Sequence, residues 1–233
     1  MYKDHTIAAV IPARKGSKRL PKKNIRDFCG RPLIALTIEE AIKSEYIDTV
    51  IVTSDDPEVL RIASKYNIVS INRPKNLSDD NSKSKDVVKH ALNEAKLKFE
   101  SFILLQPTSP LRTVNDIDEA IEELYLKSAD SIVSVSECEH NPLWSNTLPE
   151  NNSMKHFIKE GNENIRSQYL EKHYRLNGAI YAVNTSFFKS SQNFFGDNTF
   201  AYHMPAEKSI DIDTLSDFIC AEAIMTYNIS KKK

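Results

Sequence analysis

The chain has 233 residues, with 31 basic and 32 acidic side chains, a formal net charge of −1 and a pI near 6.6. This balance gives no electrostatic case for nucleic-acid binding, and the apolar runs are too short for a membrane span or a secretory leader. The three cysteines, Cys29, Cys138 and Cys220, are odd in number and widely spaced, so we expect reduced thiols and a cytoplasmic protein.

Strand and helix patterns alternate over the first 135 residues. Apolar or β-branched runs predict strands at 7–11, 49–53, 68–71, 102–105 and 131–135. Apolar stripes of helical period predict helices between them, over 34–42, 59–66, 87–95 and 117–124. This alternation predicts an α/β fold with a doubly wound, mostly parallel sheet. Ligands of such sheets lie beyond the carboxyl ends of the strands, which singles out residues 12–24, 53–56, 72–84 and 106–112.

The pattern changes after Val135. Residues 136–176 are polar and irregular, yet they carry too many apolar side chains for a disordered insertion: Trp144, Phe157, Ile158, Ile165, Tyr169 and Leu170. We expect this segment to be an insertion that packs on another surface, such as a second subunit. A strand is predicted at 179–183, and a last helix with Leu215, Phe218, Ile219 and Ala223 on its inner face. The chain therefore reads as one domain over residues 1–233.

The segment from Pro12 to Asn24 is strongly basic. Six of its thirteen residues are Lys or Arg, and it follows the first strand directly. Cationic side chains and backbone N–H groups at a strand end suit a triphosphate, whereas the alternative is a solvated basic loop. It lacks the spacing of a P-loop and of a dinucleotide-binding fingerprint.

Two carboxylates near the C-terminus form a candidate metal site. Asp211 and Asp213 alternate in an apparently extended segment, so both point to one side, as Mg²⁺ binding requires. The alternative is that Asp213 is the N-cap of the last helix. For the group from Thr53 to Asp56 we favour a helix cap over a metal site. Gln106 ends a buried strand before Pro107, which holds it toward the ligand edge or simply starts a turn.

Several of these segments together resemble a known family. The matching motifs are Ile11-Pro12-Ala13-Arg14, Gly16-Ser17-Lys18, Leu20-Pro21-Lys22-Lys23-Asn24, Thr53-Ser54-Asp55-Asp56, Arg73-Pro74, 104–113, Asn177-Gly178-Ala179-Ile180-Tyr181 and 209–214. In this order they resemble the CMP-sialic acid synthetases (acylneuraminate cytidylyltransferases) over nearly the whole chain.

The resemblance implies a Rossmann-like nucleotidyltransferase with a small dimerisation insertion at 136–176. It also implies that the protein is a homodimer. It implies that CTP and a nonulosonic (sialic-acid-like) sugar react with Mg²⁺ to give a CMP-sugar and pyrophosphate. The implied catalytic residues are Arg14, Lys23, Asp211 and Asp213, the last two also binding the metal. The implied nucleotide-binding residues are Ala13, Arg14, Lys18, Lys23, Asn24, Arg73 and Ser84. The implied sugar-binding residues are Gln106, Arg166, Gln168, Arg175, Asn177, Tyr181, Phe194 and Phe195; the two phenylalanines are equally good core residues.

The chain departs from the family pattern on the sugar side. Trp144 stands where many members have a Lys that would pair with the sugar carboxylate, and Ser167 replaces an Arg, leaving Arg166 one place early. These differences leave the sugar open, with legionaminic acid among the candidates. Two alternatives remain. A 3-deoxy-manno-octulosonate cytidylyltransferase is disfavoured by the motif from Asn177 to Tyr181, and a non-catalytic nucleotide-sensing module by the presence of all four implied catalytic residues.

Overall fold

The structure is a computed structural model that describes residues 2–158, 161, 165–166 and 169–231. Its strands are β1 (Ile7–Pro12), β2 (Asp27–Phe28), β3 (Arg31–Pro32), β4 (Thr49–Ser54), β5 (Val69–Asn72), β6 (Ser101–Leu105), β7 (Ser131–Glu137), β8 (Tyr174–Asn184) and β9 (Thr199–His203). Its α-helices are α1 (Leu33–Lys43), α2 (Pro57–Ala63), α3 (Ser84–Glu94), α4 (Val114–Leu126), α5 (Thr185–Ser191) and α6 (Leu215–Lys231). Short 3₁₀ turns lie at Lys23–Ile25, Lys75–Leu77, Pro142–Trp144 and Ala206–Lys208.

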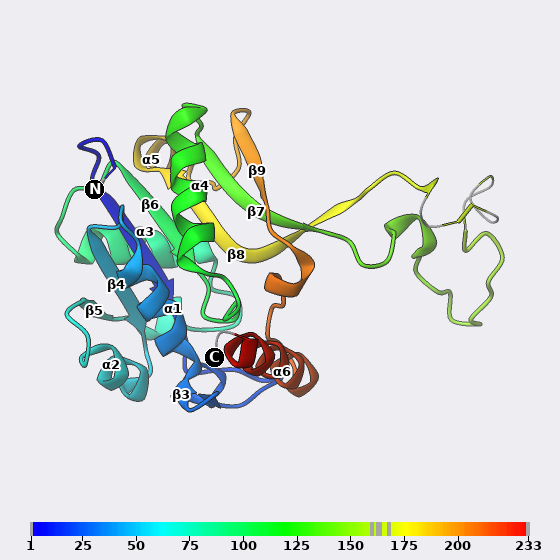
Figure 1. The fold of residues 1–233 in the computed structure, drawn as a ribbon, viewed down its shortest axis with the longest axis horizontal. Helices are drawn as coiled ribbons and strands as arrows, with labels where there is room; N and C mark the ends of the chain where they lie inside the picture. The colour runs from blue at the N-terminus through cyan, green and yellow to red at the C-terminus, as the bar shows by residue number, and fades with distance from the viewer. Residues whose placement is uncertain (1, 159–160, 162–164, 167–168, 232–233) are drawn as a thin grey trace.

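Seven strands form one sheet in the order β5-β4-β1-β6-β8-β7-β9 (Figure 1). β1 pairs in parallel with β4 and β6, β5 with β4, and β9 with β7, whereas β8 runs antiparallel to both its neighbours. The sheet is therefore mostly parallel, which confirms the predicted α/β Rossmann-like fold. Antiparallel β8 brings its first residues to the edge where the parallel strands end.

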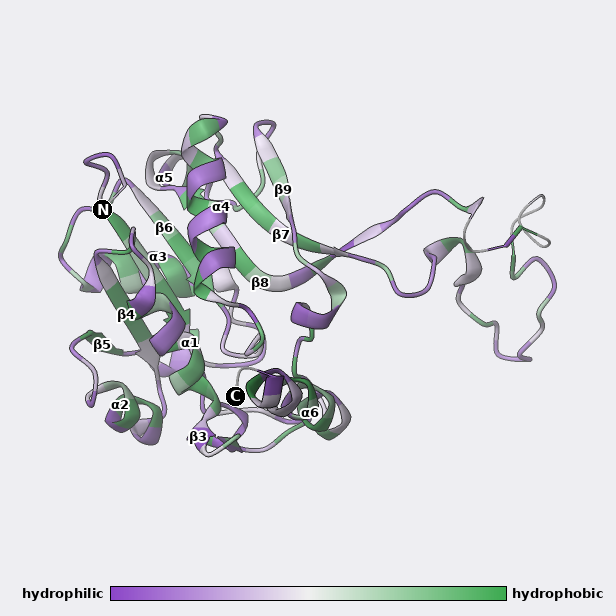
Figure 2. Cartoon of the chain, viewed as in Figure 1, coloured by the Kyte–Doolittle hydropathy of each residue, from purple (hydrophilic) through white to green (hydrophobic). Residues whose placement is uncertain are grey.

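Helices cover both faces of the sheet. Alternate residues of β1 enter two different cores: Ile7, Ala9 and Ile11 pack with α1, α2 and α4, and Ala8 and Val10 pack with α3 and α5. Period-two alternation in a strand buried on both sides produces this division. Figure 2 shows the resulting concentration of hydrophobic residues along the central strands.

The prediction of which face of α6 is buried is wrong in part. Leu215, Ile219 and Ala223 are exposed, and the buried residues are Phe218 and Ala221. The helix contacts the body on one side only, through a third apolar cluster shared with the hairpin β2–β3 and the start of α1. Its apolar residues surround the helix, so their spacing did not identify the buried side.

The described residues between 138 and 173 leave the body as an arm between β7 and β8 (Figure 1). The irregular part is thus shorter than the expected 136–176, because both strands continue into the base of the arm. Large apolar side chains remain exposed on the arm and its base: Trp144, Leu148, Met154, Tyr169, Tyr174 and Leu176. The surface that the arm was expected to pack against is not provided by the described residues of its own chain.

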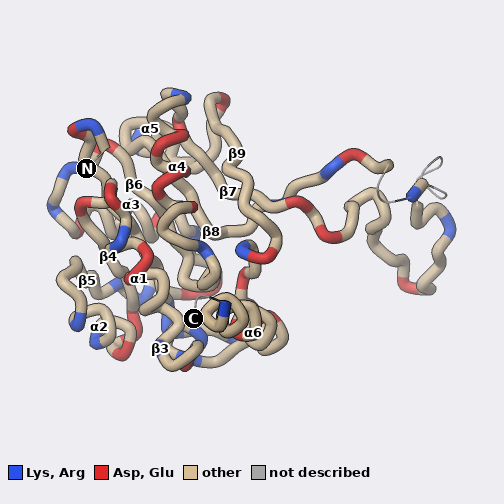
Figure 3. The backbone as a smooth tube through the Cα atoms, viewed as in Figure 1, with Lys and Arg blue, Asp and Glu red and all other residues tan. Residues whose placement is uncertain are grey.

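Charge is spread over the whole molecule. Figure 3 shows Lys and Arg interspersed with Asp and Glu on both body and arm. Cys29, Cys138 and Cys220 are free thiols. No helix within the described part of the chain is long and apolar enough to cross a membrane.

Candidate functional site

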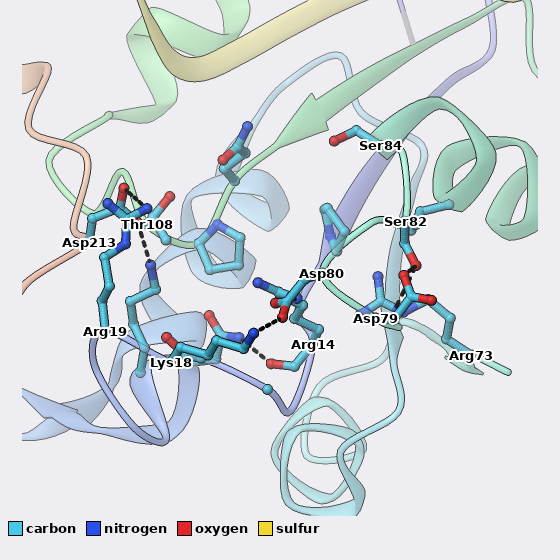
Figure 4. Close-up of a pocket in the computed structure, with 18 of the residues that line it drawn as sticks. Arg14, Lys18, Arg19, Arg73, Asp79, Asp80, Ser82, Ser84, Thr108 and Asp213 are labelled. Atoms are coloured by element: carbon cyan, nitrogen blue, oxygen red, sulfur yellow. Dashed lines mark hydrogen bonds and ion pairs between the residues drawn. The ribbon is translucent and has the colours of Figure 1, made fainter. Parts of the chain in front are cut away.

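The carboxyl ends of β1, β4, β5 and β6 meet at one edge of the sheet. The residues at and after the ends of β1, β5 and β6 border a cavity of about 520 Å³ there (Figure 4). The cavity is lined by three of the four segments expected to bind a ligand, 12–24, 72–84 and 106–112, together with Asp211 and Asp213. Nine predicted site residues line it: Arg14, Lys18, Lys23, Asn24, Arg73, Ser84, Gln106, Asp211 and Asp213.

Hydrogen bonds to the backbone hold the basic loop in place. The Ala13 N–H donates to the Thr53 carbonyl at 3.0 Å, and the Asn24 amide donates to the Arg14 carbonyl at 3.0 Å. The Lys15 N–H donates to Asp55 Oδ1 at 2.9 Å. These bonds fix the loop backbone. Four of the six cationic side chains of the loop line the cavity, those of Arg14, Lys18, Arg19 and Lys23. Ala13 itself is buried and does not line the cavity.

The two aspartates after β4 have different tasks. Asp56 is the N-cap of α2, accepting a hydrogen bond from the Glu58 N–H at 3.0 Å, which confirms the predicted helix cap. Asp55 joins the basic loop to Arg73, whose Nη2 lies 3.6 Å from the same oxygen that accepts from Lys15. Asp55 therefore positions two walls of the cavity.

Part of the buried guanidinium of Arg73 lacks a hydrogen-bond acceptor. The residue is only 5% exposed, its buried Nε has no hydrogen-bond partner, and its Nη2 has only the 3.6 Å ion pair with Asp55. Burial lowers the pKa of Arg73, and the charge of Asp55 opposes that shift. Unpaired buried donors cost free energy, so a ligand carbonyl or ring nitrogen placed here would be bound favourably. Ser84, the first residue of α3, lines the same end of the cavity.

The carboxylates at the other end are tied to the basic loop. Lys23 Nζ donates to the Ile212 carbonyl at 2.5 Å and lies 3.1 Å from Asp213, which also pairs with Arg19 at 2.8 Å. Residues almost two hundred positions apart are thus joined. Burial raises the pKa of Asp211, and the neighbouring Asp213 adds to the shift.

Asp213 is not the cap of the last helix. The Thr214 hydroxyl accepts from the Asp217 N–H at 3.3 Å, and Asp217 accepts from the Thr214 N–H at 2.7 Å. This reciprocal pair makes Thr214 the N-cap of α6. The alternative role for Asp213 is therefore excluded, and its carboxylate faces the cavity.

Asp211 and Asp213 fit a divalent cation of the Mg²⁺ type. Asp211 Oδ1 is buried without a hydrogen-bond partner, which is the state of an oxygen that lacks its ligand. Mg²⁺ is commonly held by one or two carboxylates together with substrate phosphates and water. Within the described residues no group of three or more His, Cys, Asp and Glu side chains forms a metal cage, so the phosphates would complete the coordination.

Gln106 lines the cavity at the end of β6. It extends from the end of β6 beside Gly178, whose φ of +73° favours glycine. A Cβ atom at that glycine would lie 3.5 Å from the Gln106 amide. Burial raises the pKa of Tyr181, and the charge of Asp211 adds to the effect, so the ring lies near the carboxylates.

Tyr181 also contacts the two phenylalanines. Its ring centroid is 5.5 Å from that of Phe194 and 6.3 Å from that of Phe195. Phe194 stacks on buried Phe188 at 5.4 Å and belongs to the core, whereas Phe195 is exposed. Tyr181, Phe194 and Phe195 lie outside the cavity lining.

Asn177 lies beneath the site, and its side-chain amide makes four hydrogen bonds within the protein. The residue is 2% exposed, and its amide donates to Ser209 Oγ at 2.9 Å and to the Met204 sulfur at 3.3 Å. Its Oδ1 accepts from the Ser134 hydroxyl at 2.6 Å and the Ala179 N–H at 3.1 Å. This arrangement anchors the segment that leads to Asp211 and leaves no free group of Asn177 for a sugar.

The other sugar-side predictions lie outside the cavity lining. Arg175 donates to the Ser209 carbonyl at 3.3 Å, next to Asn177 on β8. Arg166 is exposed on the arm, which projects away from the body (Figure 1). Gln168 lies outside the described residues.

Several polar lining residues were given no site role from the sequence, among them Arg19, Asp79, Asp80, Ser82 and Thr108. Asp80 contacts the basic loop, and its signal was its place in the segment 72–84. Charge alone did not distinguish it from adjacent Asp79.

Comparisons with known proteins agree with this geometry. Residues 8–223 match the cytidylyltransferase family. The chain is 38% identical over 220 residues to an N-acylneuraminate cytidylyltransferase of Escherichia coli, covering 94% of this chain and 52% of that protein. It is 33% identical to a pseudaminic acid cytidylyltransferase of Campylobacter jejuni (94% and 96% covered) and 34% identical to a CMP-N,N'-diacetyllegionaminic acid synthase of Legionella pneumophila (95% and 97%). It thus spans about half of the first relative and nearly all of the other two.

Solved structures share the fold. The CMP:2-keto-3-deoxy-manno-octonic acid synthetase complexed with CTP superposes with a TM-score of 0.71 at 18% identity, over 96% of this chain and 99% of that one. The 4-diphosphocytidyl-2C-methyl-D-erythritol synthase of Anaerococcus prevotii gives 0.63 at 16% identity, over 95% and 96%. With a match over most of its length and relatives above 30% identity, this chain belongs to the cytidylyltransferase family.

Proposed function

We propose that this protein joins CTP to a nonulosonic acid, giving a CMP-sugar and pyrophosphate. The observation that carries the proposal is one cavity with two chemically distinct ends. Buried Arg73, whose Nε has no hydrogen-bond partner, lies at one end, and Lys23, Asp211 and Asp213 lie at the other, with the basic loop between them. A nucleotide needs a polar pocket for its base, cations for its phosphates and carboxylates for a phosphate-bound cation.

In the proposed reaction the anomeric 2-hydroxyl of the sugar attacks the α-phosphorus of CTP. A new P–O bond forms, the bond from the α-phosphorus to the bridging oxygen breaks, pyrophosphate leaves, and the hydroxyl proton passes to solvent. Negative charge increases on the phosphate oxygens as the reaction proceeds. Arg14, Lys18 and Lys23 line the cavity where they would stabilise this charge, so most of the catalysis is positioning and electrostatic stabilisation.

Arg73 and Ser84 would bind the cytosine. A cytosine presents a carbonyl and a ring nitrogen as acceptors on the edge that a guanidinium and a hydroxyl can reach. Asn24 would act through the loop, since its amide holds the Arg14 carbonyl.

Mg²⁺ is the proposed cofactor, and bound there it would draw charge from the phosphates and orient them. Asp211 and Asp213 would hold it. Lys23 keeps Asp213 in place, and burial of Asp211 leaves one of its oxygens ready for a ligand.

The proposed sugar is a nine-carbon 2-keto acid of the sialic, pseudaminic or legionaminic type. Two relatives that this chain spans almost entirely are named for pseudaminic and diacetyllegionaminic acid. Gln106, Tyr181 and Phe195 would contact the sugar. The likeness to the octonic acid synthetase rests on 18% identity and supports the fold alone.

The proposal includes a homodimer in the cytoplasm, with the arm as the dimerisation insertion. The exposed apolar residues of the arm support a partner surface, and Arg166 would then reach the sugar site of the partner subunit. The free thiols fit a reducing compartment.

A pyrophosphate-release assay with CTP and Mg²⁺ against a panel of nonulosonic acids tests the function. We expect release that requires CTP and at least one nine-carbon acid, and a much lower rate with the eight-carbon 3-deoxy-manno-octulosonic acid. Release with the eight-carbon acid alone would favour a 3-deoxy-manno-octulosonate cytidylyltransferase instead. No release with any sugar would contradict the proposed reaction.

A further inference from the structure

Asp80 forms ion pairs with two cationic side chains of the basic loop, Arg14 and Lys18. Its carboxylate accepts from Arg14 Nη1 at 2.6 Å and pairs with Lys18 Nζ at 2.5 Å. Figure 4 shows Asp80 reaching across the cavity toward these side chains from the segment before α3. Both cations belong to the group that the proposed function assigns to the triphosphate.

A carboxylate and a phosphate cannot share these donors without cost. The hydrogen-bonding groups of Arg14 and Lys18 that now face Asp80 are those that a phosphate oxygen would use, and like charges at contact distance repel. Lys18 and Arg14 hold the pKa of Asp80 below its ordinary value, so the carboxylate is ionised at neutral pH. A triphosphate that engages Arg14 Nη1 and the Lys18 ammonium therefore competes with Asp80 for them.

The turn that carries Asp80 is built so that displacement is local. Asp79 Oδ1 accepts from the Asn81 N–H at 3.0 Å and from the Ser82 hydroxyl at 2.7 Å, which closes the turn on itself. Asp80 is a half-exposed side chain on this turn. Its carboxylate can rotate into solvent without breaking the bonds that define the turn.

We propose that Asp80 is an internal competitor of the triphosphate that sets the affinity for CTP and pyrophosphate. This inference rests on the proposed function and adds an affinity-determining residue to it. With no nucleotide bound, Asp80 neutralises the two cations; when the triphosphate binds, they exchange the carboxylate for phosphate. The same exchange in reverse assists the departure of pyrophosphate.

The test compares Asp80→Asn with Asp79→Asn by titration calorimetry at fixed Mg²⁺ and ionic strength. Asp79→Asn removes the same charge one residue away and keeps an acceptor oxygen for the turn, so it controls for the general field. Exposed ion pairs are individually weak, so we expect Asp80→Asn to tighten binding of CTP and of inorganic pyrophosphate by about three- to tenfold. Cytidine, which has no phosphate, should bind the wild type and both variants equally.

Different outcomes identify different errors. Unchanged CTP and pyrophosphate affinity in Asp80→Asn would overturn the competition, and weaker binding would show that Asp80 is itself a ligand of the nucleotide or its metal. An equal gain in Asp79→Asn would reduce the effect to net charge and also overturn it. Wild-type protein that binds pyrophosphate but not CTP would count against the proposed function, while the pyrophosphate series would still decide the role of Asp80.

Discussion

Lys23 connects the two halves of the site through a single side chain. Its ammonium is largely buried, donates to the Ile212 carbonyl and pairs with Asp213. Because it lies beside the carboxylates and lines the cavity, it is placed both to orient Asp213 and to stabilise charge on the phosphates. Its removal should affect the transition state more than the binding of either substrate.

We predict that Lys23→Ala lowers kcat by about 100-fold or more, the effect of losing one preorganised charge donor. Lys22→Ala is the matched control, because that adjacent lysine is exposed and outside the cavity lining, and it should stay within about twofold of wild type. Pyrophosphate release under saturating CTP and sugar measures both. Equal turnover in the two variants would contradict the role given to Lys23.

Arg73 should determine recognition of the base. Lysine retains the charge but loses the planar fork, and a hydrogen bond from a charged donor contributes about 1.5–3 kcal/mol. We therefore predict that Arg73→Lys weakens CTP binding by about 10- to 100-fold and leaves pyrophosphate binding within about twofold. Calorimetry with both ligands separates these effects. A parallel loss for pyrophosphate would place Arg73 at the phosphates instead.

Residues with a strong local signal were predictable, and residues defined by a distant contact were not. Arg14 and Lys23 lie in an unusually basic loop, so charge and the family resemblance identified them. Asp55 and Asp80 act on that loop from 40 and 66 positions away, which no local pattern reveals. Asn177 was assigned to the sugar by resemblance, yet its burial and four internal bonds place it in support of Ser209.

At the scale of elements, α6 fixes the direction of the carboxylate segment. Its N-cap Thr214 follows Asp213 directly, and Asp217 bonds the backbone of both residues. The start of the helix therefore holds the end of the segment that carries Asp211 and Asp213.

We predict that Thr214→Ala destabilises the protein by about 1 kcal/mol, the usual cost of losing an N-cap hydroxyl. For a chain of this size that lowers the Tm by about 2–4 °C. Ser230→Ala on the same helix is the control. Its exposed side chain donates to the Tyr227 carbonyl within the helix, and alanine favours a helix, so its Tm should not fall. Thermal unfolding by circular dichroism measures both, and equal losses would contradict the cap.

The central strands could be predicted from the sequence, whereas the edge strand β9 and the start of β8 could not. β1, β4 and β6 are buried on both faces, so their apolar runs are unmistakable. β9 is an edge strand with mostly exposed side chains, and the first residues of β8 form part of an exposed ribbon with β7. Such strands lack a strong apolar pattern, so β9 was not predicted and β8 was expected to begin later.

The described part of the molecule is a body with a protruding arm. The three apolar clusters lie within the body, while several large apolar side chains on the described residues of the arm and its base are exposed. Large exposed apolar patches of this kind mark sites of protein association. An equivalent arm on a second copy offers a symmetric partner, since two-fold dimers are the commonest soluble assemblies.

We predict that the protein is a dimer whose light-scattering mass is twice the 26.5 kDa of the chain at micromolar concentration. Leu176 is 52% exposed at the base of the arm, so Leu176→Asp should bury a charge at the interface and shift the mass to that of one chain. Leu126→Asp provides the control, because Leu126 is 70% exposed on α4 in the body and the same change there should leave a dimer. The monomeric variant should also lose sugar turnover while it still binds CTP, because the nucleotide cavity lies within one chain. A wild-type mass of one chain would contradict the dimer, and a dimeric Leu176→Asp would place its interface elsewhere.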